Sequence, residues 1–81
     1  MKLARDMSGK ELIKQLGKYG YTVTRQTGNH VRLTTNINGE HHVTIPRDKV
    51  LRVGTLNNII KEVSIHLEKD KDEIIKGIQG R

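Results

Sequence analysis

Three short runs of alternating apolar and polar residues follow one another in the first half of this chain. Such period-2 alternation is typical of β-strands that bury one face. The apolar members must share that face if the sheet is to bury anything, which restricts how the strands can pair. The runs are Tyr21–Arg25, Asn29–Thr35 and Glu40–Ile45, and their apolar members are Val23, Val31, Leu33, Val43 and Ile45.

The connections between the runs determine the predicted topology. Loops of three residues keep every apolar member on one face, and each loop ends in glycine, as a type I turn followed by a G1 bulge requires. The sequence therefore predicts a three-stranded antiparallel meander with Gly28 and Gly39 at positive φ. The loops are Gln26–Gly28, which pairs Val23 with Val31, and Ile37–Gly39, which pairs Leu33 with Val43.

Helical patterns flank the strands. The stretch Ser8–Glu11 matches a capping box, in which each side chain accepts a hydrogen bond from a free backbone N–H. The apolar spacing after it predicts a helix at about Gly9–Tyr19. We expect a basic loop at Arg47–Gly54, then an amphipathic helix with Thr55 as its N-cap. The free N–H groups at that helix start would also suit an anion.

A last charged helix is expected at about Leu67–Ile78. The predicted order is then α-β-β-β-α plus a C-terminal helix, with the helices on one face of the sheet. We interpret residues 1–81 as a single α+β domain, because a chain of 81 residues is long enough for only one small core.

Charge and composition narrow the class of protein. Fifteen Lys and Arg against nine Asp and Glu give a net charge of +6, and the whole excess lies in residues 1–55. Such a field suits a polyanion or an acidic protein partner. Cysteine is absent, which excludes disulfides and thiolate metal sites. Because no apolar run approaches the roughly 20 residues that span a bilayer, we expect no membrane partner and a cytoplasmic location.

Side chains alternate between the two faces of a strand, and this alternation, here called strand parity, places His30 on the outward face, opposite the valines. Thr24, Arg32 and His42 share this face, on which no aromatic residue is expected, so base stacking is disfavoured as a mode of RNA recognition. No carboxylate is expected beside the strand histidines, which argues against a zinc site. The chain also has no glycine-rich phosphate loop and no cysteine nucleophile, and we expect no cofactor.

Four stretches in this order and spacing resemble the HicA-type toxins of toxin–antitoxin pairs: Ser8–Leu16, Arg25–His30, Ile45–Pro46 and Val53–Ile60. The resemblance covers residues 8–63. It implies a double-stranded-RNA-binding-domain-like (dsRBD-like) fold, cleavage of mRNA by a single histidine, and a HicB-type antitoxin that covers the active site. His30 matches that histidine, and Gly28 and Asn29 match its turn. Many members have a second histidine where this chain has Asp48.

These observations lead to a hypothesis for the reaction and its alternatives. His30 is the expected catalytic residue, because an imidazole can accept or donate a proton near neutral pH. In the expected reaction the RNA 2′-OH attacks the adjacent phosphate, and Arg32 would neutralise the negative charge that builds up on that phosphate. A non-catalytic RNA-binding module and a small protein that docks an acidic partner remain open. Residues expected to contact the RNA backbone are Thr24, Asn29, Arg32, Arg47, Lys49 and Arg52, with Gly28 forming the turn and no metal ligand among them.

Overall fold

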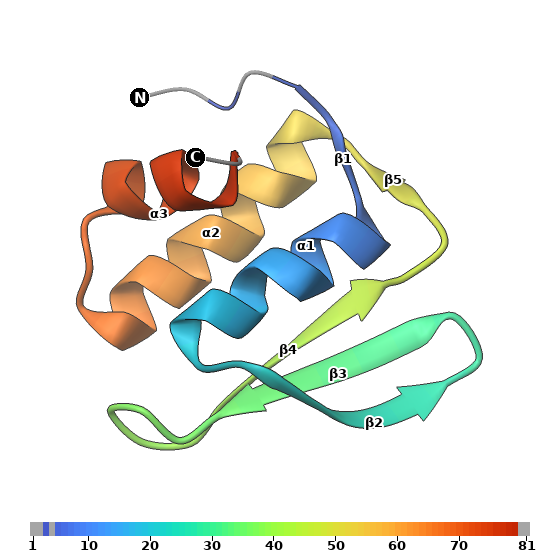
Figure 1. Cartoon of the computed structure of the whole chain (residues 1–81), viewed down its shortest axis with the longest axis horizontal. Helices are drawn as coiled ribbons and strands as arrows, with labels where there is room; N and C mark the ends of the chain where they lie inside the picture. Colours follow the sequence, from blue (N-terminus) through green and yellow to red (C-terminus); the bar gives the residue numbers. More distant parts are fainter. Residues whose placement is uncertain (1–2, 4, 80–81) are drawn as a thin grey trace.

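The computed structural model of this chain describes residues 3 and 5–79. A sheet lies on one side of three helices, and a second pair of short strands lies near the N-terminal segment (Figure 1). The elements are β1 (Met7–Ser8), α1 (Gly9–Leu16), the 3-10 turn η1 (Gly17–Tyr19), β2 (Thr22–Thr27), β3 (His30–Thr35), β4 (His41–Pro46), β5 (Val50–Leu51), α2 (Val53–Leu67) and α3 (Lys71–Ile78).

The main sheet is the predicted antiparallel meander. Its order is β2-β3-β4, and the helices cover one of its faces (Figure 1). Gly28 has φ of 59° and Gly39 has φ of 97°, so both predicted positive-φ glycines are confirmed. The fold class is therefore α+β with a dsRBD-like arrangement, as expected. No helix among the described residues has both the length and the apolarity needed to cross a bilayer.

The two hairpins differ in how well parity predicted them. Between β3 and β4 the register is the expected one, with Leu33 opposite Val43. Between β2 and β3 the prediction was wrong, because Val23 pairs with Leu33 instead of Val31. The turn there has two residues, Gly28 and Asn29, and positive φ at the first alone is typical of a type II′ turn.

A β-bulge at Thr24 accounts for the difference. The register of β2 shifts between Val23 and Arg25, so one extra residue is absorbed inside the strand instead of in the turn. Every residue of this edge strand is exposed. Val23, which we expected in the core, is 53% exposed, because it lies on the edge strand beyond the helices that cover β3 and β4.

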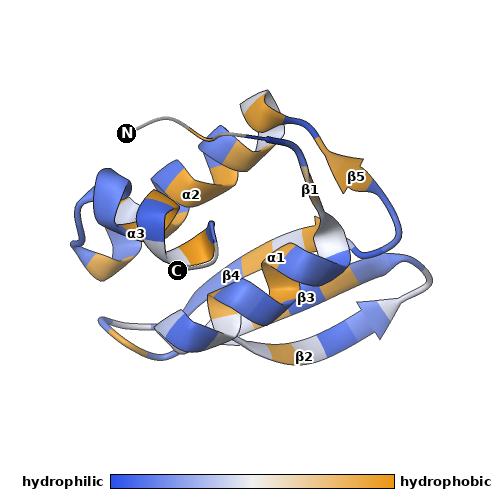
Figure 2. Cartoon of the chain, turned by 45° about the horizontal axis from the view of Figure 1, so that its top comes forward, coloured by the Kyte–Doolittle hydropathy of each residue, from blue (hydrophilic) through white to orange (hydrophobic). Residues whose placement is uncertain are grey.

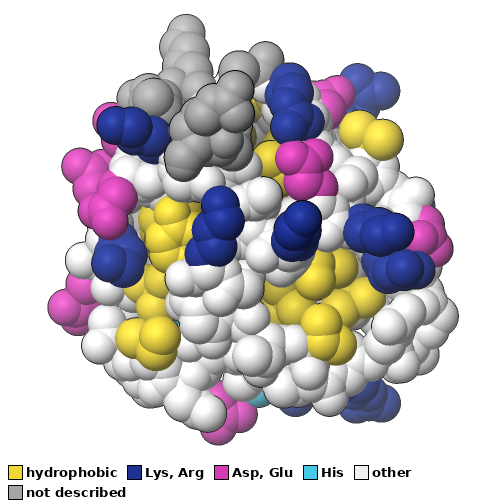
Figure 3. All heavy atoms as spheres, in the orientation of Figure 1, with side chains coloured by type: hydrophobic (Ala, Val, Ile, Leu, Met, Phe, Trp, Pro, Cys, Tyr) yellow, Lys and Arg dark blue, Asp and Glu magenta, His cyan; other side chains and the backbone are white. Residues whose placement is uncertain are grey.

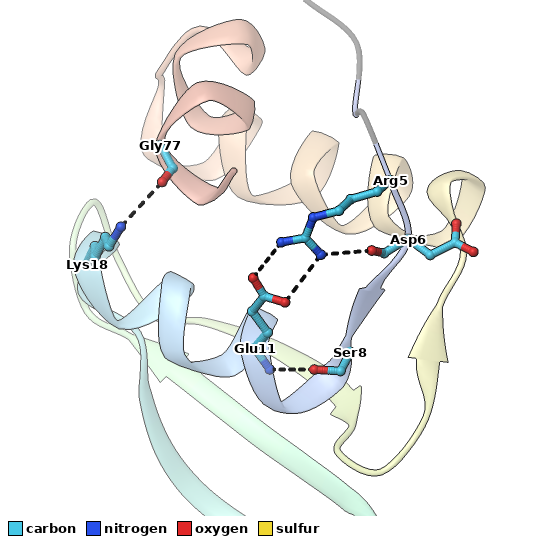
Figure 4. Close-up of polar contacts among 6 residues, drawn as sticks. All are labelled: Arg5, Asp6, Ser8, Glu11, Lys18 and Gly77. Atoms are coloured by element: carbon cyan, nitrogen blue, oxygen red, sulfur yellow. Dashed lines mark hydrogen bonds and ion pairs between the residues drawn. The ribbon is translucent and has the colours of Figure 1, made fainter. Parts of the chain in front are cut away.

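Helix α1 begins as the sequence predicted, with one change. The Glu11 N–H donates to Ser8 Oγ at 3.0 Å, so the first half of the capping box is present (Figure 4). The second half is replaced, because the Glu11 carboxylate accepts hydrogen bonds from the Arg5 guanidinium, the shorter at 2.9 Å. Ser8 itself lies in β1, opposite Val50 of β5.

The start of α2 differs from the prediction. The helix begins at Val53, whose N–H donates to Asp6 Oδ1 at 3.1 Å, and Thr55 lies inside the first turn. Pairing of β1 with β5 brings Asp6 to this helix end, a contact between residues far apart in the sequence. The predicted Thr55 cap and the anion site at this helix start are therefore both corrected, because a carboxylate of the chain already occupies the position.

The C-terminal helix is shorter than expected. Leu67 is the last residue of α2, and Glu68 adopts a left-handed conformation with φ of 55° that ends the helix. Helix α3 starts at Lys71, and Asp70 caps it by accepting from the Asp72 N–H at 2.9 Å. The expected basic loop at Arg47–Gly54 likewise contains the short strand β5.

A single apolar core fills the space between the sheet and the helices. Apolar side chains of all three helices and of the inner faces of β3 and β4 meet there, as the distribution of hydrophobic residues indicates (Figure 2). Each fully buried side chain of this size contributes about 1.5–3 kcal/mol by leaving water. Members that are at most 2% exposed include Leu12, Leu16, Tyr21, Val31, Leu33, Ile45, Leu56, Ile60, Val63, Ile74, Ile75 and Ile78.

Candidate functional site

The outer face of the main sheet carries the candidate catalytic histidine. His30 is the first residue of β3 and is exposed, as strand parity predicted. It lies between Thr27 of β2 and Pro46 of β4, its two cross-strand partners. Its neighbours on the sheet are therefore the ends of the two flanking strands, and the face beside it is open to solvent.

The turn before His30 is fastened to the loop after β4. Asn29 accepts two backbone hydrogen bonds from this loop, one from the Arg47 N–H to its carbonyl oxygen at 2.8 Å. The other runs from the Asp48 N–H to Asn29 Oδ1 at 2.6 Å. Both segments lie at the same end of the molecule, on the right in Figure 1. Asn29 thus positions the loop beside His30, and its amide oxygen is already used.

Helix α1 fastens the same loop from the other side. The Gly9 N–H donates to the Lys49 carbonyl at 2.8 Å, and the Lys10 N–H donates to the Arg47 carbonyl at 3.0 Å. The approach is so close that a Cβ atom on Gly9 would overlap the Pro46 carbonyl, lying 2.8 Å from its carbon. Glycine is required here for packing, and the free N–H groups of this helix end have partners within the chain.

The predicted loop cations lie around this end of the sheet. Arg47 contacts its neighbour Asp48 at 3.5 Å, which offsets part of its charge. Lys49 and Arg52 are exposed on either side of β5. The structure thus holds the loop with Arg47 and Lys49 against the turn before His30, whereas Arg52 lies beyond β5 at the start of α2.

The bulge in β2 adds an arginine that parity reasoning missed. Because Thr24 is the extra residue, Arg25 stands directly opposite Arg32 of β3, and Thr44 of β4 is opposite Arg32 on its other side. Regular alternation would have put Arg25 on the inner face. Only a sequence signal for a bulge could have predicted this position, and threonine in a strand gives none.

Thr24 is not beside His30, where the expected pairing of Val23 with Val31 would have put it. Its hydroxyl lies 2.7 Å from Thr34 Oγ1, which in turn lies 2.7 Å from His42 Nδ1. The other ring nitrogen of His42 contacts the Glu40 carboxylate at 2.8 Å. This outer face therefore does hold one carboxylate, which we had not expected, and it is engaged with His42.

The remaining strand histidine has a structural environment. His41 Nδ1 lies 2.8 Å from the Tyr21 hydroxyl, and its ring stacks on His66 with centroids 4.4 Å apart. Burial and the neighbouring His66 lower the pKa of His41 below its ordinary value. Burial also raises the pKa of Tyr21 to about 12. These groups belong to the packing between sheet and helix, away from the open face.

Other parts of the surface offer fewer candidates. Figure 3 shows one face of the molecule, on which Lys and Arg are interspersed with Asp, Glu and apolar side chains, and almost no histidine is visible. Among residues 3 and 5–79, no three His, Asp or Glu side chains are grouped so that they could hold a metal ion.

These features define a class of protein, namely a small basic α+β domain with a dsRBD-like sheet whose open face presents a histidine and arginines. Residues 9–65 match the family described as the HicA toxin of bacterial toxin–antitoxin systems, and the chain belongs to this family. The protein is accordingly the toxin of a toxin–antitoxin pair, with an antitoxin as its partner. No curated protein and no solved structure matched the chain.

Proposed function

We propose that this toxin is an endoribonuclease that cleaves mRNA without a metal ion, uses His30 as its catalytic residue, and thereby blocks translation. The observation that carries the proposal is the position of His30, exposed on an open sheet face and bordered by a cationic loop. Membership of a toxin family supports a harmful enzymatic activity. Because the proposed substrate is mRNA, we expect the protein to act in the cytoplasm.

The reaction needs only the RNA and one proton-transfer group. The 2′ oxygen attacks the adjacent phosphorus in line, the bond from phosphorus to the 5′ oxygen breaks, and the products are a 2′,3′-cyclic phosphate and a 5′ hydroxyl. Neutral His30 accepts the 2′-OH proton, or its protonated form donates a proton to the leaving 5′ oxygen. Arg32, two residues along the same face, supplies positive charge to the bound phosphates.

A single histidine implies a modest rate. His42 is opposite Thr34, which lies four residues beyond His30 on β3, or about 13 Å along the strand. That distance is too long for both imidazoles to act on one phosphate. On the described face, no second proton-transfer group lies within reach of His30. This observation favours the alternative function, a non-catalytic RNA-binding module.

The antitoxin partner is proposed to be a HicB-type protein with an acidic surface. The excess of six positive charges within residues 1–55 favours such a partner. We expect it to cover the face that holds His30 and Arg32, and so to compete with RNA. A complex in which that face stays open while RNA cleavage continues would contradict this mode of inhibition.

The test is cleavage of RNA by the purified wild-type chain and by His30→Ala, both in excess chelator. We expect wild-type cleavage to persist in chelator, to disappear in the variant, and to stop when the scissile 2′-OH is replaced by hydrogen. Expression of the wild type alone should arrest growth, and His30→Ala should be harmless. Because His30 is exposed, the substitution should cost well under the roughly 2 kcal/mol typical of core truncations.

Other outcomes of this experiment would contradict or change the proposal. Full activity in His30→Ala would refute the mechanism. Cleavage of the deoxy substrate at the same bond would identify water as the nucleophile. RNA binding with a steep salt dependence but no cleavage would support the non-catalytic RNA-binding module.

A further inference from the structure

Arg25 and Arg32 form a pair of like charges on the outer sheet face. They stand directly opposite each other on β2 and β3, a placement that is destabilising for two cations in the absence of a counter-ion. Neither guanidinium has a carboxylate partner among the described residues, where the ion pairs join other side chains. The carboxylate on this face, Glu40, is engaged with His42. The pair therefore has donors and charge to offer an anion.

The surroundings favour a phosphate over a protein carboxylate. Thr24, the bulge residue, and Thr44 flank the pair with hydroxyls, and their strands place no apolar side chain next to it on this face. Protein interfaces usually have an apolar centre, whereas phosphate backbones are bound by guanidinium and hydroxyl groups. The Gly9 and Lys10 N–H groups at the start of α1 are paired within the chain. At the start of α2 the Asp6 carboxylate accepts from the Val53 N–H and would repel an anion, so neither helix start competes for the phosphate.

Spacing along β3 connects the pair to the proposed catalytic residue. Arg32 follows His30 by two residues on the same face, which corresponds to about 6.7 Å along the strand. Consecutive phosphates of an extended RNA strand are separated by a comparable distance. A strand that lies along β3 can thus present one phosphate to His30 and the next to the arginines.

We propose that Arg25 and Arg32 form a clamp that grips a single RNA phosphate, the one adjacent to the phosphate cleaved at His30. Arg25 reaches this position only because of the bulge at Thr24. The fork of each guanidinium suits two hydrogen bonds to phosphate oxygens, so the clamp binds backbone and carries no preference among bases. The choice of RNA as the ligand rests on the proposed function.

The experiment measures binding of a single-stranded RNA oligonucleotide to full-length His30→Ala, in which cleavage cannot interfere. Arg25→Gln and Arg32→Gln are added singly and together, and the dissociation constant is measured over a range of salt concentrations. Lys61→Gln is the matched control, because it removes one positive charge from an exposed position on α2. Thermal unfolding of each variant reports any structural effect.

We expect each arginine variant to bind about tenfold more weakly, as the loss of a charge-assisted contact implies, and Lys61→Gln to change affinity less than twofold. Because both arginines hold one phosphate, the double variant should lose less than the product of the single effects. The slope of log affinity against log salt should fall by about 0.7, the value for one phosphate of a single strand. Arg25→Gln should not lower the melting temperature, since it relieves repulsion.

Several results would overturn the clamp. The first is an Arg25→Gln variant that binds RNA as tightly as Lys61→Gln does. The second is a double variant whose loss of affinity equals the product of the single losses, with a salt slope that falls by the value for two phosphates. The third is the absence of RNA binding by His30→Ala. Unchanged RNA affinity together with weaker antitoxin binding would reassign the pair to a protein partner. If binding behaves as expected but wild type never cleaves RNA, the clamp stands and the endoribonuclease proposal fails. Cleavage that depends on His30 without any effect of the arginine variants would remove the clamp and leave the endoribonuclease proposal standing.

Discussion

The contact between α1 and the loop after β4 provides the sharpest test of the packing around the site. Replacing Gly9 with alanine places a methyl group against the Pro46 carbonyl, and the three nearest atoms that it would meet all belong to the backbone. The loop must move, and the two hydrogen bonds from Gly9 and Lys10 to the Lys49 and Arg47 carbonyls would be lost.

The expected cost follows from those contacts. Two backbone hydrogen bonds contribute about 1 kcal/mol each, and forcing a methyl group against the packed backbone costs about 1 kcal/mol more. Alanine recovers up to about 1 kcal/mol through its higher helix propensity and the lower entropy of the unfolded chain. We therefore expect Gly9→Ala to lower the free energy of unfolding by about 2 kcal/mol, which corresponds to a fall in melting temperature of roughly 10 °C.

The assay is urea unfolding followed by circular dichroism, with Gly17→Ala as the matched control. Gly17 has an ordinary helical conformation with φ of −57°, and a Cβ atom there meets nothing within 4 Å. That variant should be as stable as wild type or more stable, by up to about 1 kcal/mol. Because the displaced loop adjoins His30, Gly9→Ala should also bind RNA more weakly. If Gly9→Ala is at least as stable as Gly17→Ala, the loop is not held as described.

Three further predictions concern other contacts. Asn29→Ala should lower the free energy of unfolding by about 1 kcal/mol and slow RNA cleavage, because the Asp48 N–H loses its acceptor. Asn29→Asp keeps that acceptor and should keep most of the stability. Equal losses of stability in both variants would show that the side-chain oxygen of Asn29 does not hold the loop. Asp6→Ala should cost about 1 kcal/mol through loss of the α2 cap, and Thr55→Ala should be nearly neutral in the same unfolding assay. The pKa of His41 is lowered in the folded chain, so just below pH 6.5 the unfolded chain binds a proton at His41 more readily than the folded chain does. The free energy of unfolding should therefore rise with pH in this range. His41→Gln should flatten this pH dependence when it is measured by urea unfolding.

Local patterns in the sequence were sufficient for the elements and for the face on which His30 lies. Alternation over β3 and β4 set the pairing of Leu33 with Val43, because an error of one residue would have exposed the apolar face. Ser8 as a cap and Gly28 and Gly39 at positive φ followed from the chemistry of those residues at turns and helix ends. Such signals act within a few residues, and so they can be read from the chain alone.

The tertiary structure decided the features that depend on contacts between residues far apart in the sequence. The bulge that turns Arg25 outward is one of two ways to absorb an extra residue between β2 and β3, and nothing local distinguishes it from a longer turn. Asp6 replaces Thr55 as the cap of α2 because β1 pairs with β5. The hydrogen bonds of Asn29 hold the loop that carries Arg47 and Lys49 beside the turn before His30. The sequence by itself determined the histidine and its face, whereas long-range pairing determined which charges surround it, because those positions depend on contacts formed only when the whole chain packs.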